Sequence, residues 1–494
     1  MQRTAWRQSP FSMMLARTPR LRTIRCPTRT LSGESRSGAR PKRWTPCPRQ
    51  SADAFSPSMC AATSWLRRFW RSHHEREPVR LVGFLCADSR RSGRRSGRRP
   101  SMKSVAVFHP GLQHAHQLAW GLHERGLLQT FWSGVPLSGT GARPLPIIPA
   151  RLRAKMRSTV IPHALRHHPV WWQVLLRARS LARSAPARHD YTHRVFHWFD
   201  WWVSRQVHAL KPRAVVGYEN SSYHTFMAAR SVGAICILDA PSLHHEDAKL
   251  LIEVPSNGYI EEINRRKDKE VELADLVITC SDMARDSYMK AGVSGTKVKS
   301  VLLGAELPEG VARPFENERP VQFIFAGTLS SRKSIDLILD AFAQLNTDSH
   351  RADLILVGGT EEPQWLTKAK QIPHVRHRPN VPQAQLYQLF AEADCLLLPS
   401  RFDAFGMVVV EAMATGTPAI VSTMTGAREI IALFPDSGWV VEPTAESIFR
   451  CMEDKVVNRQ AIRQASPYAL KAAGHFTWRA YRRRVSSLIA DTLE

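Results

Sequence analysis

The feature that most constrains the fold is a series of short apolar runs that recurs from residue 102 onward. The runs are almost continuously apolar, as expected for parallel strands that helices cover on both faces. One group of runs comprises residues 104–108, 214–218, 234–238, 276–280 and 299–304, and a second comprises 321–326, 354–357, 395–399, 419–422 and 439–441. Segments of helical periodicity lie between them. The alternation predicts an α/β protein with two Rossmann-like, doubly wound parallel sheets that face a cleft.

Two of the intervening segments show helical spacing clearly. Their apolar residues keep one face at intervals of three and four, and these residues are Ile335, Ile338, Leu339, Phe342 and Leu345 in the first segment and Leu386, Leu389, Phe390 and Ala393 in the second. The polar, proline-broken segment 306–320 separates the two groups of strands and is the predicted linker. We therefore expect one domain over residues 102–305 and another over residues 321–474.

Positive charge is concentrated in the first 101 residues. The chain has a formal net charge of +26, and residues 1–101 contribute 23 Lys and Arg against 5 Asp and Glu. This Arg-, Ser- and Pro-rich segment has no sustained apolar period, so we predict that it is disordered. Two interpretations stay open. Translation starts at Met102 and the preceding residues are a mis-called start, or the segment is a basic tail for nucleic acid or acidic lipid.

Two classes of protein are disfavoured by composition. No apolar run approaches the ~18–20 residues that a membrane span needs. The eight cysteines form no C-x-x-C pair and no tight cluster, which argues against a zinc knuckle or a disulfide scaffold and favours a reducing compartment. We expect a cytoplasmic protein.

The loop after the run 321–326 predicts an anion site. A glycine, Gly327, is followed by a short polar loop with Arg332 and Lys333, and Ser334 is placed to cap the next helix. Backbone N–H groups at a helix start and two cations suit a diphosphate. The structural alternative is a solvated basic turn.

Two carboxylates, Asp403 and Glu411, lie eight positions apart in SRFDAFGMVVVEAMATG. The pattern predicts a helix that begins near Gly406 and is closed by Gly416, with Asp403 before its start and Glu411 inside it. Carboxylates accept hydrogen bonds from paired sugar hydroxyls, so the acids are candidates for holding a sugar and a ribose. The structural alternative is a helix-capping Asp and a Glu at the edge of the core.

These segments resemble the retaining family-4 glycosyltransferases (glycosyl transferases group 1), which have the GT-B fold. The resemblance rests on AGTLSSRKSIDLILDAF, DLILVGG, LYQLFAEADCLLLPSRFDAFGMVVVEAMATGTPAIV and TGAREII. It covers most of residues 102–494, is weaker in the first half and excludes residues 1–101. It implies that 102–305 is the acceptor domain, that 321–474 binds the nucleotide sugar, and that a helix over 475–494 crosses back to the first domain.

The resemblance also implies roles for single residues in the second half. Glu411 corresponds to the acid that binds the nucleotide ribose, and Asp403 to the acid that binds the donor sugar, although the family usually has Glu there. The backbone of four residues would line the sugar: Ala404, Phe405, Gly406 and Met407.

The basic pair Arg332 and Lys333 corresponds to the residues that hold the donor diphosphate, next to Gly327. Many relatives carry Arg directly after this glycine, where this chain has Thr328. The implied reaction needs no metal, and no D-x-D pair lies in a suitable loop. The expected substrate is a nucleotide-diphosphate sugar, with no separate cofactor.

In the first half, HPGLQHAHQLAWGLHERG resembles the family's glycine-rich first loop, with Gly111 near the donor phosphates and His114 or His116 facing the cleft. The segment LDAPSLHHEDAK follows another strand. Its His244 or His245 is the candidate for the histidine that relatives place near the reacting sugar. A packing or solvent role for these histidines is the alternative.

Residues 141–202 form a basic, tryptophan-containing segment. Ten Lys and Arg and no acid fall between residues 141 and 189. This pattern predicts a peripheral contact with an anionic membrane, on the inner face of the cytoplasmic membrane, and a lipid-linked acceptor. The alternative is a solvated basic face or one that binds an anionic acceptor.

The interpretation that the residues favour is glycosyl transfer to a saccharide or lipid-linked acceptor, in surface polysaccharide or glycolipid synthesis. A sugar-nucleotide epimerase and a non-catalytic GT-B sugar-nucleotide-binding protein are the alternatives. No nucleic-acid motif occurs outside residues 1–101, so nucleic acid is not an expected partner. The sequence leaves the base, sugar, acceptor and linkage open.

Overall fold

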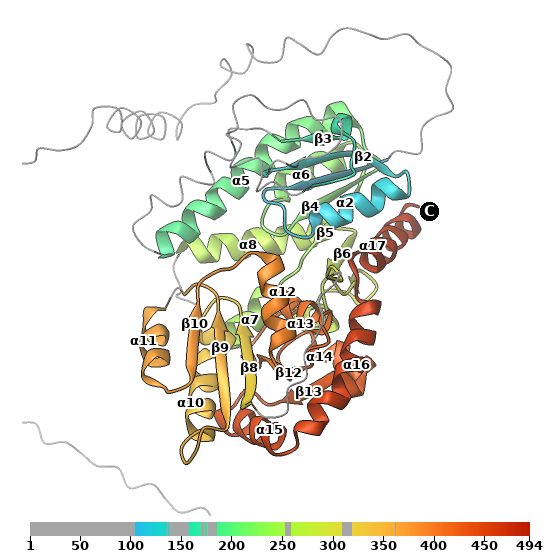
Figure 1. Ribbon diagram of the computed structural model, residues 1–494. Helices are drawn as coiled ribbons and strands as arrows, with labels where there is room; N and C mark the ends of the chain where they lie inside the picture. Colours follow the sequence, from blue (N-terminus) through green and yellow to red (C-terminus); the bar gives the residue numbers. More distant parts are fainter. Residues whose placement is uncertain are drawn as a thin grey trace, which may run out of the picture. The chain divides into compact units, whose positions relative to one another are not determined.

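Two parallel β-sheets organise the described part of the chain (Figure 1). The computed structural model describes residues 104–135, 137, 158–168, 172, 175, 185–251, 258–308, 319–360 and 362–494. The first sheet has the strand order β3-β2-β1-β4-β5-β6-β7 and the second has the order β10-β9-β8-β11-β12-β13. Every pair of neighbouring strands in both sheets runs parallel.

The strands of the first sheet are β1 (Val105–His109), β2 (Leu128–Ser133), β3 (Arg166–His167), β4 (Ala214–Tyr218), β5 (Ile235–Asp239), β6 (Leu276–Thr279) and β7 (Val298–Ser300). Those of the second are β8 (Val321–Ala326), β9 (Ala352–Val357), β10 (Val375–Arg378), β11 (Cys395–Leu398), β12 (Ala419–Ser422) and β13 (Gly438–Val441).

The helices that accompany the first sheet are α2 (Ala115–Glu124), α5 (Ala185–Leu210), α6 (Tyr223–Ser231), α7 (His245–Leu251), α8 (Gly258–Leu273) and α9 (Asp282–Lys290). Those that follow are α10 (Ile335–Leu345), α11 (Pro363–Gln371), α12 (Gln383–Glu392), α13 (Met407–Met413), α14 (Arg428–Leu433), α15 (Ala445–Val457), α16 (Arg459–His475) and α17 (Trp478–Leu493). Short 3-10 helices are η1 (His163–Leu165), η3 (Ser331–Lys333) and η4 (Pro435–Ser437).

The strand order reverses once in each sheet, between β1 and β4 in the first and between β8 and β11 in the second. This is the doubly wound topology that the sequence predicts, so that prediction is confirmed. The predicted strands agree with the observed ones to within two residues, except that 299–304 ends as a strand at Ser300. The sequence does not predict three of the observed strands, which are β2, β3 and β10. Of these, β3 and β10 lie at sheet edges, where polar residues interrupt the apolar run because one side faces solvent.

Helices cover both faces of the first sheet because its strands are apolar on both faces. Val105 and Val107 of β1 share a buried cluster with Leu118 of α2. The intervening Ala106 and Phe108 point the opposite way and share a second cluster with apolar residues of α5 and α6. The alternation follows from the two-residue period of a strand.

The second sheet is packed in the same way, and α10 confirms the predicted apolar face. The residues of α10 that are fully or almost fully buried are Ile335, Ile338, Leu339, Ala341, Phe342 and Leu345. They join the strands β8, β9 and β11 in one cluster.

The C-terminal helix α17 packs against α2, and the two lie side by side in Figure 1. Arg482 of α17 donates to Gln117 at 2.9 Å and to Glu124 at 3.1 Å, and its guanidinium lies 4.2 Å from the ring centroid of Trp120. The helices approach so closely that a Cβ on Gly121 would lie 2.7 Å from the backbone oxygen of Arg482. The predicted domain boundaries themselves stay predictions.

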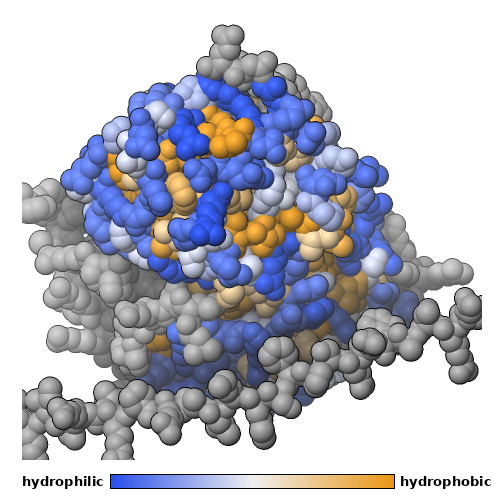
Figure 2. Space-filling view, turned by 90° about the horizontal axis from the view of Figure 1, so that it is seen from below, coloured by the Kyte–Doolittle hydropathy of each residue, from blue (hydrophilic) through white to orange (hydrophobic). Residues whose placement is uncertain are grey.

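The surface seen in Figure 2 is mostly hydrophilic, with hydrophobic side chains gathered in limited patches. Scattered apolar residues are normal on a protein surface. Within the described ranges, no helix is both long enough and apolar enough to cross a bilayer.

Several predictions concern residues outside the described ranges. They are the disorder of residues 1–101, most of the linker 306–320, and much of the basic segment 141–202. Of the last segment, the structure describes residues 158–168, 172, 175 and 185–202.

Candidate functional site

A cavity of about 740 Å³ lies where the strand order of each sheet reverses. Its wall contains Gln113, which follows β1, and Tyr218 at the end of β4. It also contains Gly327 after β8 and Asp403 after β11. Doubly wound sheets bind ligands at such positions, and the volume is within the ~300–1,000 Å³ typical of ligand pockets.

Asp403 organises the start of α13. Gly406, with φ of 85°, turns the chain into the helix, a conformation that glycine adopts readily. The Oδ1 atom of Asp403 accepts hydrogen bonds from the backbone N–H of Gly406 at 3.1 Å and of Phe405 at 3.3 Å. The predicted start of this helix near Gly406 is therefore confirmed, and Asp403 holds the turn that precedes it.

The other oxygen of Asp403, Oδ2, pairs with the ammonium of Lys333. Both side chains are about 15% exposed or less. Burial acts to raise the pKa of Asp403, but Lys333, Arg332 and the backbone donors outweigh it and hold the pKa below its usual value. The two oxygens of the Asp403 carboxylate therefore have different partners. Oδ1 accepts from the backbone just before α13, and Oδ2 pairs with Lys333 at the cavity wall.

Lys333 and Arg332 lie on η3, just before α10. Lys333 lines the cavity, whereas Arg332 does not and donates to the backbone oxygen of Phe402 at 3.2 Å. The prediction that the Ser334 side chain caps α10 is wrong. Ser334 stands at the N-cap position with φ of 57°, and its side chain makes no capping bond. Its left-handed conformation departs from the extended backbone of an ordinary N-cap residue.

A second ion pair fixes the loop after β11. Arg401 donates to both oxygens of Asp336, at 2.7 and 2.6 Å, and Asp336 lies in the first turn of α10. Burial acts to raise the pKa of Asp336, but the hydrogen bonds and charge of Arg401 lower it on balance. The pair joins the loop that carries Asp403 to the helix that follows Lys333.

Glu411 lies on α13 and also lines the cavity. Its Oε1 accepts a hydrogen bond from the side-chain amide of Gln383 at 3.1 Å. Burial, and then the charge of Glu411, raise the pKa of the Tyr387 hydroxyl to about 12. The structure thus brings both predicted acids to one cavity.

Two glycines bring the ends of β8 and β9 together in the wall. Gly327 has φ of 148° and Gly358 has φ of 141°. A Cβ on Gly358 would lie 1.9 Å from the backbone oxygen of Gly327, so only glycine fits at position 358 without a shift of the backbone.

The first half of the chain supplies the opposite part of the wall. Gln113 accepts a hydrogen bond from the hydroxyl of Tyr218 at 2.9 Å. Of the two histidines predicted to face the cleft, His114 lines the cavity and pairs with Asp239 at 2.9 Å, whereas His116 is buried on α2.

Gly111, the predicted phosphate-loop glycine, is not in the wall. Its N–H donates to Nδ1 of His109 at 2.9 Å. Burial, and then the neighbouring His114, lower the pKa of His109 to about 3, so this imidazole is neutral and accepts the bond.

His244 and His245 are not in the wall either. Both contact Asp268 of α8. Burial, and then the neighbouring His245, lower the pKa of His244. Their predicted role near the reacting sugar stays a prediction.

Several contacts tie the second half of the chain, including the loop 403–407, to residues 281–283 of the first half. The hydroxyl of Ser281 donates to the backbone oxygen of Ala404 at 2.5 Å. Nearby, Glu429 accepts hydrogen bonds from the backbone N–H of Asp282 and of Met283, each at 2.8 Å. Burial raises the pKa of Glu429.

The wall also contains residues that the sequence analysis did not name as candidate site residues. They are Gln113, Tyr218, Pro241, Ser242, Cys280, Leu303, Ala326, Thr328, Val357, Gly358, Asn380, Val381, Leu386, Val408 and Trp478. Gly358 had a signal, because it follows a strand directly in DLILVGG. Tyr218, Cys280, Leu303, Asn380, Val381 and Trp478 lie outside the quoted motifs and carry no local signal for a site.

The chain is similar to known glycosyltransferases in sequence. Residues 310–471 match the family described as Glycosyl transferases group 1. An uncharacterized glycosyltransferase of Methanocaldococcus jannaschii is 32% identical over 129 residues, which cover 25% of this chain and 33% of that protein. A D-inositol 3-phosphate glycosyltransferase of Nocardioides sp. is 26% identical over 313 residues, which cover 56% of this chain and 68% of that protein.

Solved structures share the fold. HepE of Anabaena, in complex with UDP and glucose, aligns with a TM-score of 0.54 at 13% identity, over 78% of this chain and 100% of that chain. The two parallel sheets therefore have the GT-B arrangement, and the second lies within the residues that match the family described as Glycosyl transferases group 1. The chain spans one third of the first relative and about two thirds of the second.

Proposed function

We propose that the chain is a retaining, metal-independent glycosyltransferase of family 4. It would move a sugar from a nucleoside-diphosphate donor to a saccharide or lipid-linked acceptor, in surface polysaccharide or glycolipid synthesis. The observation that carries the proposal is the cavity in which the Lys333–Asp403 pair, the start of α13 and Glu411 converge. The group 1 domain supports it, as do a relative named as a glycosyltransferase and a neighbour bound to UDP and glucose.

Lys333 is proposed to bind the donor diphosphate. Its ammonium pairs with Asp403, which carries one negative charge. A diphosphate carries about two charges and offers several acceptor oxygens, so it competes for the ammonium. Arg332 adds positive charge from the same 3-10 turn. As the nucleoside diphosphate departs, these cations stabilise the developing charge, and loss of one such donor typically lowers the rate by ~10²–10³.

Asp403 is proposed to accept a hydroxyl of the transferred sugar through Oδ2. This oxygen faces Lys333, while Oδ1 stays with the backbone N–H groups of Phe405 and Gly406. Movement of Lys333 toward the diphosphate leaves Oδ2 for the sugar, next to the backbone of residues 404–407. Glu411 is proposed to accept the ribose hydroxyls, in place of its contact with Gln383.

The acceptor is proposed to enter against the wall formed by the first half of the chain. Gln113, His114 and Tyr218 provide polar groups there. A second polar wall suits a reaction with two substrates, which favours transfer over epimerisation or binding alone. The acceptor hydroxyl would attack the anomeric carbon from the face that the nucleoside diphosphate leaves; the bond from that carbon to the phosphate oxygen breaks, the hydroxyl proton passes to the departing phosphate, and the configuration is retained.

A nucleotide-release assay tests the proposal. The full chain is incubated with UDP-, GDP- and ADP-sugars and candidate acceptors, and released nucleotide is measured. We expect one donor to react, and Lys333→Met to lower its rate ~10²–10³-fold. Lys368→Met is the matched control, because Lys368 pairs with an exposed carboxylate on α10. Binding without release would assign the chain to non-catalytic binding, and an inverted sugar without acceptor would assign it to epimerisation.

Glu411→Ala tests the ribose contact. Since Glu411 lines the cavity and its contact with Gln383 is exposed, we expect nucleotide affinity to fall about tenfold or more, with little change in melting temperature. A large fall in melting temperature with unchanged affinity would give Glu411 a scaffolding role.

A peripheral membrane contact is proposed for α5. Among its described side chains, five exposed residues recur at intervals of three and four and so form one stripe: Arg194, Trp198, Trp201, Arg205 and His208, with Ala209 exposed beside the last. Arg205 lies 3.7 Å from the ring centroid of Trp201. Tryptophan and arginine on one exposed face suit the headgroup zone of an anionic bilayer, and the basic segment 141–189 precedes this face.

Liposome co-sedimentation of the full chain tests this contact. We expect recovery with anionic vesicles to fall in the double variant Trp198→Ser, Trp201→Ser. The matched control is Leu433→Ser, Val457→Ser, which removes two exposed apolar side chains from α14 and α15. If the two variants are recovered equally with anionic vesicles, α5 is not the membrane contact.

A further inference from the structure

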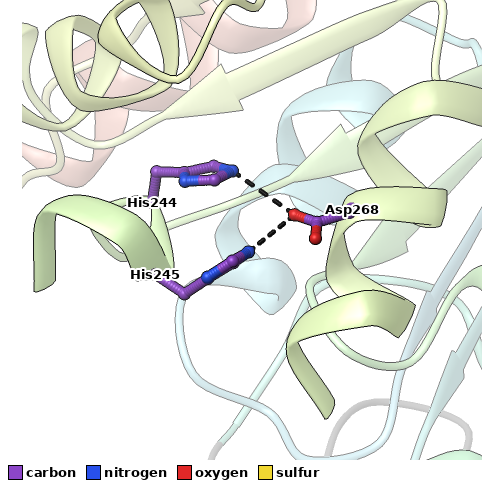
Figure 3. A group of neighbouring side chains, drawn as sticks. All are labelled: His244, His245 and Asp268. Atoms are coloured by element: carbon purple, nitrogen blue, oxygen red, sulfur yellow. Dashed lines mark hydrogen bonds and ion pairs between the residues drawn. The ribbon is translucent and has the colours of Figure 1, made fainter. Parts of the chain in front are cut away.

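A cluster of three potential metal ligands lies outside the cavity wall (Figure 3). His244 ends the loop that follows β5, His245 is the first residue of α7, and Asp268 lies on α8. Figure 3 shows both imidazoles pointing toward the same carboxylate. Residues from two helices and a loop therefore converge on one point.

Two imidazole nitrogens approach the same oxygen of Asp268, and a hydrogen bond accounts for only one of these approaches. Nε2 of His245 lies 2.6 Å from Oδ1 of Asp268, which is a hydrogen bond. Nε2 of His244 lies 3.6 Å from the same oxygen, which is too long for one. The two rings stack, with centroids 4.4 Å apart. Two imidazole nitrogens thus surround one oxygen, and only one of them bonds to it.

The spacing is close to what a metal ion requires. The three ligand atoms all lie within 4.8 Å of one another. Zinc binds imidazole nitrogen and carboxylate oxygen at ~2.0–2.2 Å, so ligands around one ion lie roughly 3–4 Å apart. A small movement of the side chains would bring the three ligand atoms from their present separations to those around a zinc ion.

The exposure of the three side chains is also consistent with metal binding. The side chains of His244 and His245 are 9% and 10% exposed, so their rings are held in place, whereas that of Asp268 is 50% exposed and leaves an entry path. Ligation through Nε2 puts the proton of His244 on Nδ1. It therefore ends the hydrogen bond that Nδ1 accepts from the Glu246 amide, which at 3.3 Å is a long one.

We propose that His244, His245 and Asp268 bind one divalent cation of the zinc class. Two imidazoles and one carboxylate match the preference of Zn²⁺, whereas Mg²⁺ prefers oxygen ligands. The inference does not rest on the proposed glycosyl transfer, because the cluster lies outside the wall. The ion would be a structural one.

The ion would tie the loop after β5 to α8 beside the cavity. Ser242, two residues before His244, lines the wall and donates to Glu219. Lys267, next to Asp268, pairs with Glu219 at 2.7 Å. The loop and α8 already meet through this carboxylate, and the ion would fasten the same two elements at a second point.

A second cluster in the described chain supplies the control. His350, Asp353 and His374 also lie within metal-binding distance of one another. Both of its histidines are more than a third exposed, and their rings stack face to face, 3.5 Å apart. Stacked, exposed rings are free to separate, so we expect this group to bind metal more weakly.

Zinc binding to the full, metal-stripped chain tests the proposal. Because the chain has 20 histidines, the readout is a difference between variants in bound Zn²⁺ per chain. We expect Asp268→Asn and His245→Gln each to lose one equivalent, and His374→Gln to lose none. We also expect Zn²⁺, but not Mg²⁺, to raise the melting temperature of the unaltered chain, and this rise to disappear in Asp268→Asn.

We expect Asp268→Asn to fold normally, since a half-exposed side chain can be replaced with little effect on folding. A loss of zinc in this variant therefore reports on the ligand and not on unfolding. The visible absorption of bound Co²⁺ provides an independent readout of the same ligands. Equal zinc uptake by the unaltered chain and Asp268→Asn would overturn the proposal. Loss of the equivalent in His374→Gln alone would also overturn it.

Discussion

The contact between Lys333 and Asp403 supports a quantitative prediction, because the two side chains face each other at the cavity wall. Two unit charges ~4 Å apart attract by about 4 kcal/mol at an effective dielectric constant near 20. Desolvation offsets much of this attraction, and the side chains are 14% and 15% exposed. We therefore expect a coupling free energy of about 1–3 kcal/mol between the two positions.

A double-mutant cycle of Lys333→Met and Asp403→Asn measures this coupling. Asp403→Asn keeps an oxygen that can accept from the backbone N–H of Phe405 and Gly406 but leaves the ammonium without a carboxylate, so we expect it to cost about 2–3 kcal/mol. Lys333→Met leaves a carboxylate that still has two backbone donors, and we expect it to cost about 1–2 kcal/mol.

The assay is urea unfolding of the four proteins at one ionic strength, followed by circular dichroism. A coupling below about 0.5 kcal/mol would show that solvent in the cavity screens the pair, and would refute this reasoning. Nucleotide binding gives a second check on Asp403→Asn. If Lys333 is shared with the diphosphate, this variant binds the bare nucleoside diphosphate at least as tightly as the unaltered chain. A tenfold loss of affinity would exclude the sharing.

Two further predictions concern the surroundings of the site. Gly358→Ala places a Cβ against a backbone oxygen of the facing strand, so we expect a loss of about 3–5 kcal/mol in the free energy of unfolding. In Gly126→Ala, where nothing lies within 4 Å, the expected loss is about 1–2 kcal/mol, and equal losses would contradict the steric argument. Arg401 lowers the pKa of Asp336, so this carboxylate stabilises the fold above its ordinary value of 3.8, and the contribution disappears as the pH falls through the folded pKa. Asp336→Asn should thus flatten the pH dependence of the unfolding free energy in acid, whereas Asp340→Asn, from an exposed ion pair on the same helix, should not.

Much of the site could be predicted because its residues follow strands directly. Lys333 and Asp403 come within a few residues of β8 and β11, and a doubly wound sheet brings the ends of those strands together. Glu411 is one to two turns along the helix that the Gly406 turn starts. Local pattern and topology together were enough to place these residues in one cavity.

Other features had no local signal. The conformation of Ser334 depends on how η3 joins α10, so the predicted cap failed although the residue type was suitable. Arg332 carries the same charge as its neighbour, yet its side chain bonds to the loop of Phe402 and stays out of the wall. Arg332 and Lys333 are adjacent cations with different surroundings, because their side chains leave the backbone in different directions.

The sequence by itself determined the two doubly wound sheets, since the spacing of apolar residues records which faces each element must bury. It also determined the acids and cations at the strand ends. Only the tertiary structure decided which distant side chains share the wall, such as Gln113 with Tyr218, and that His244 and His245 meet Asp268. Periodicity reports on neighbours along the chain, whereas these contacts depend on how loops and helices pack after the sheets have formed.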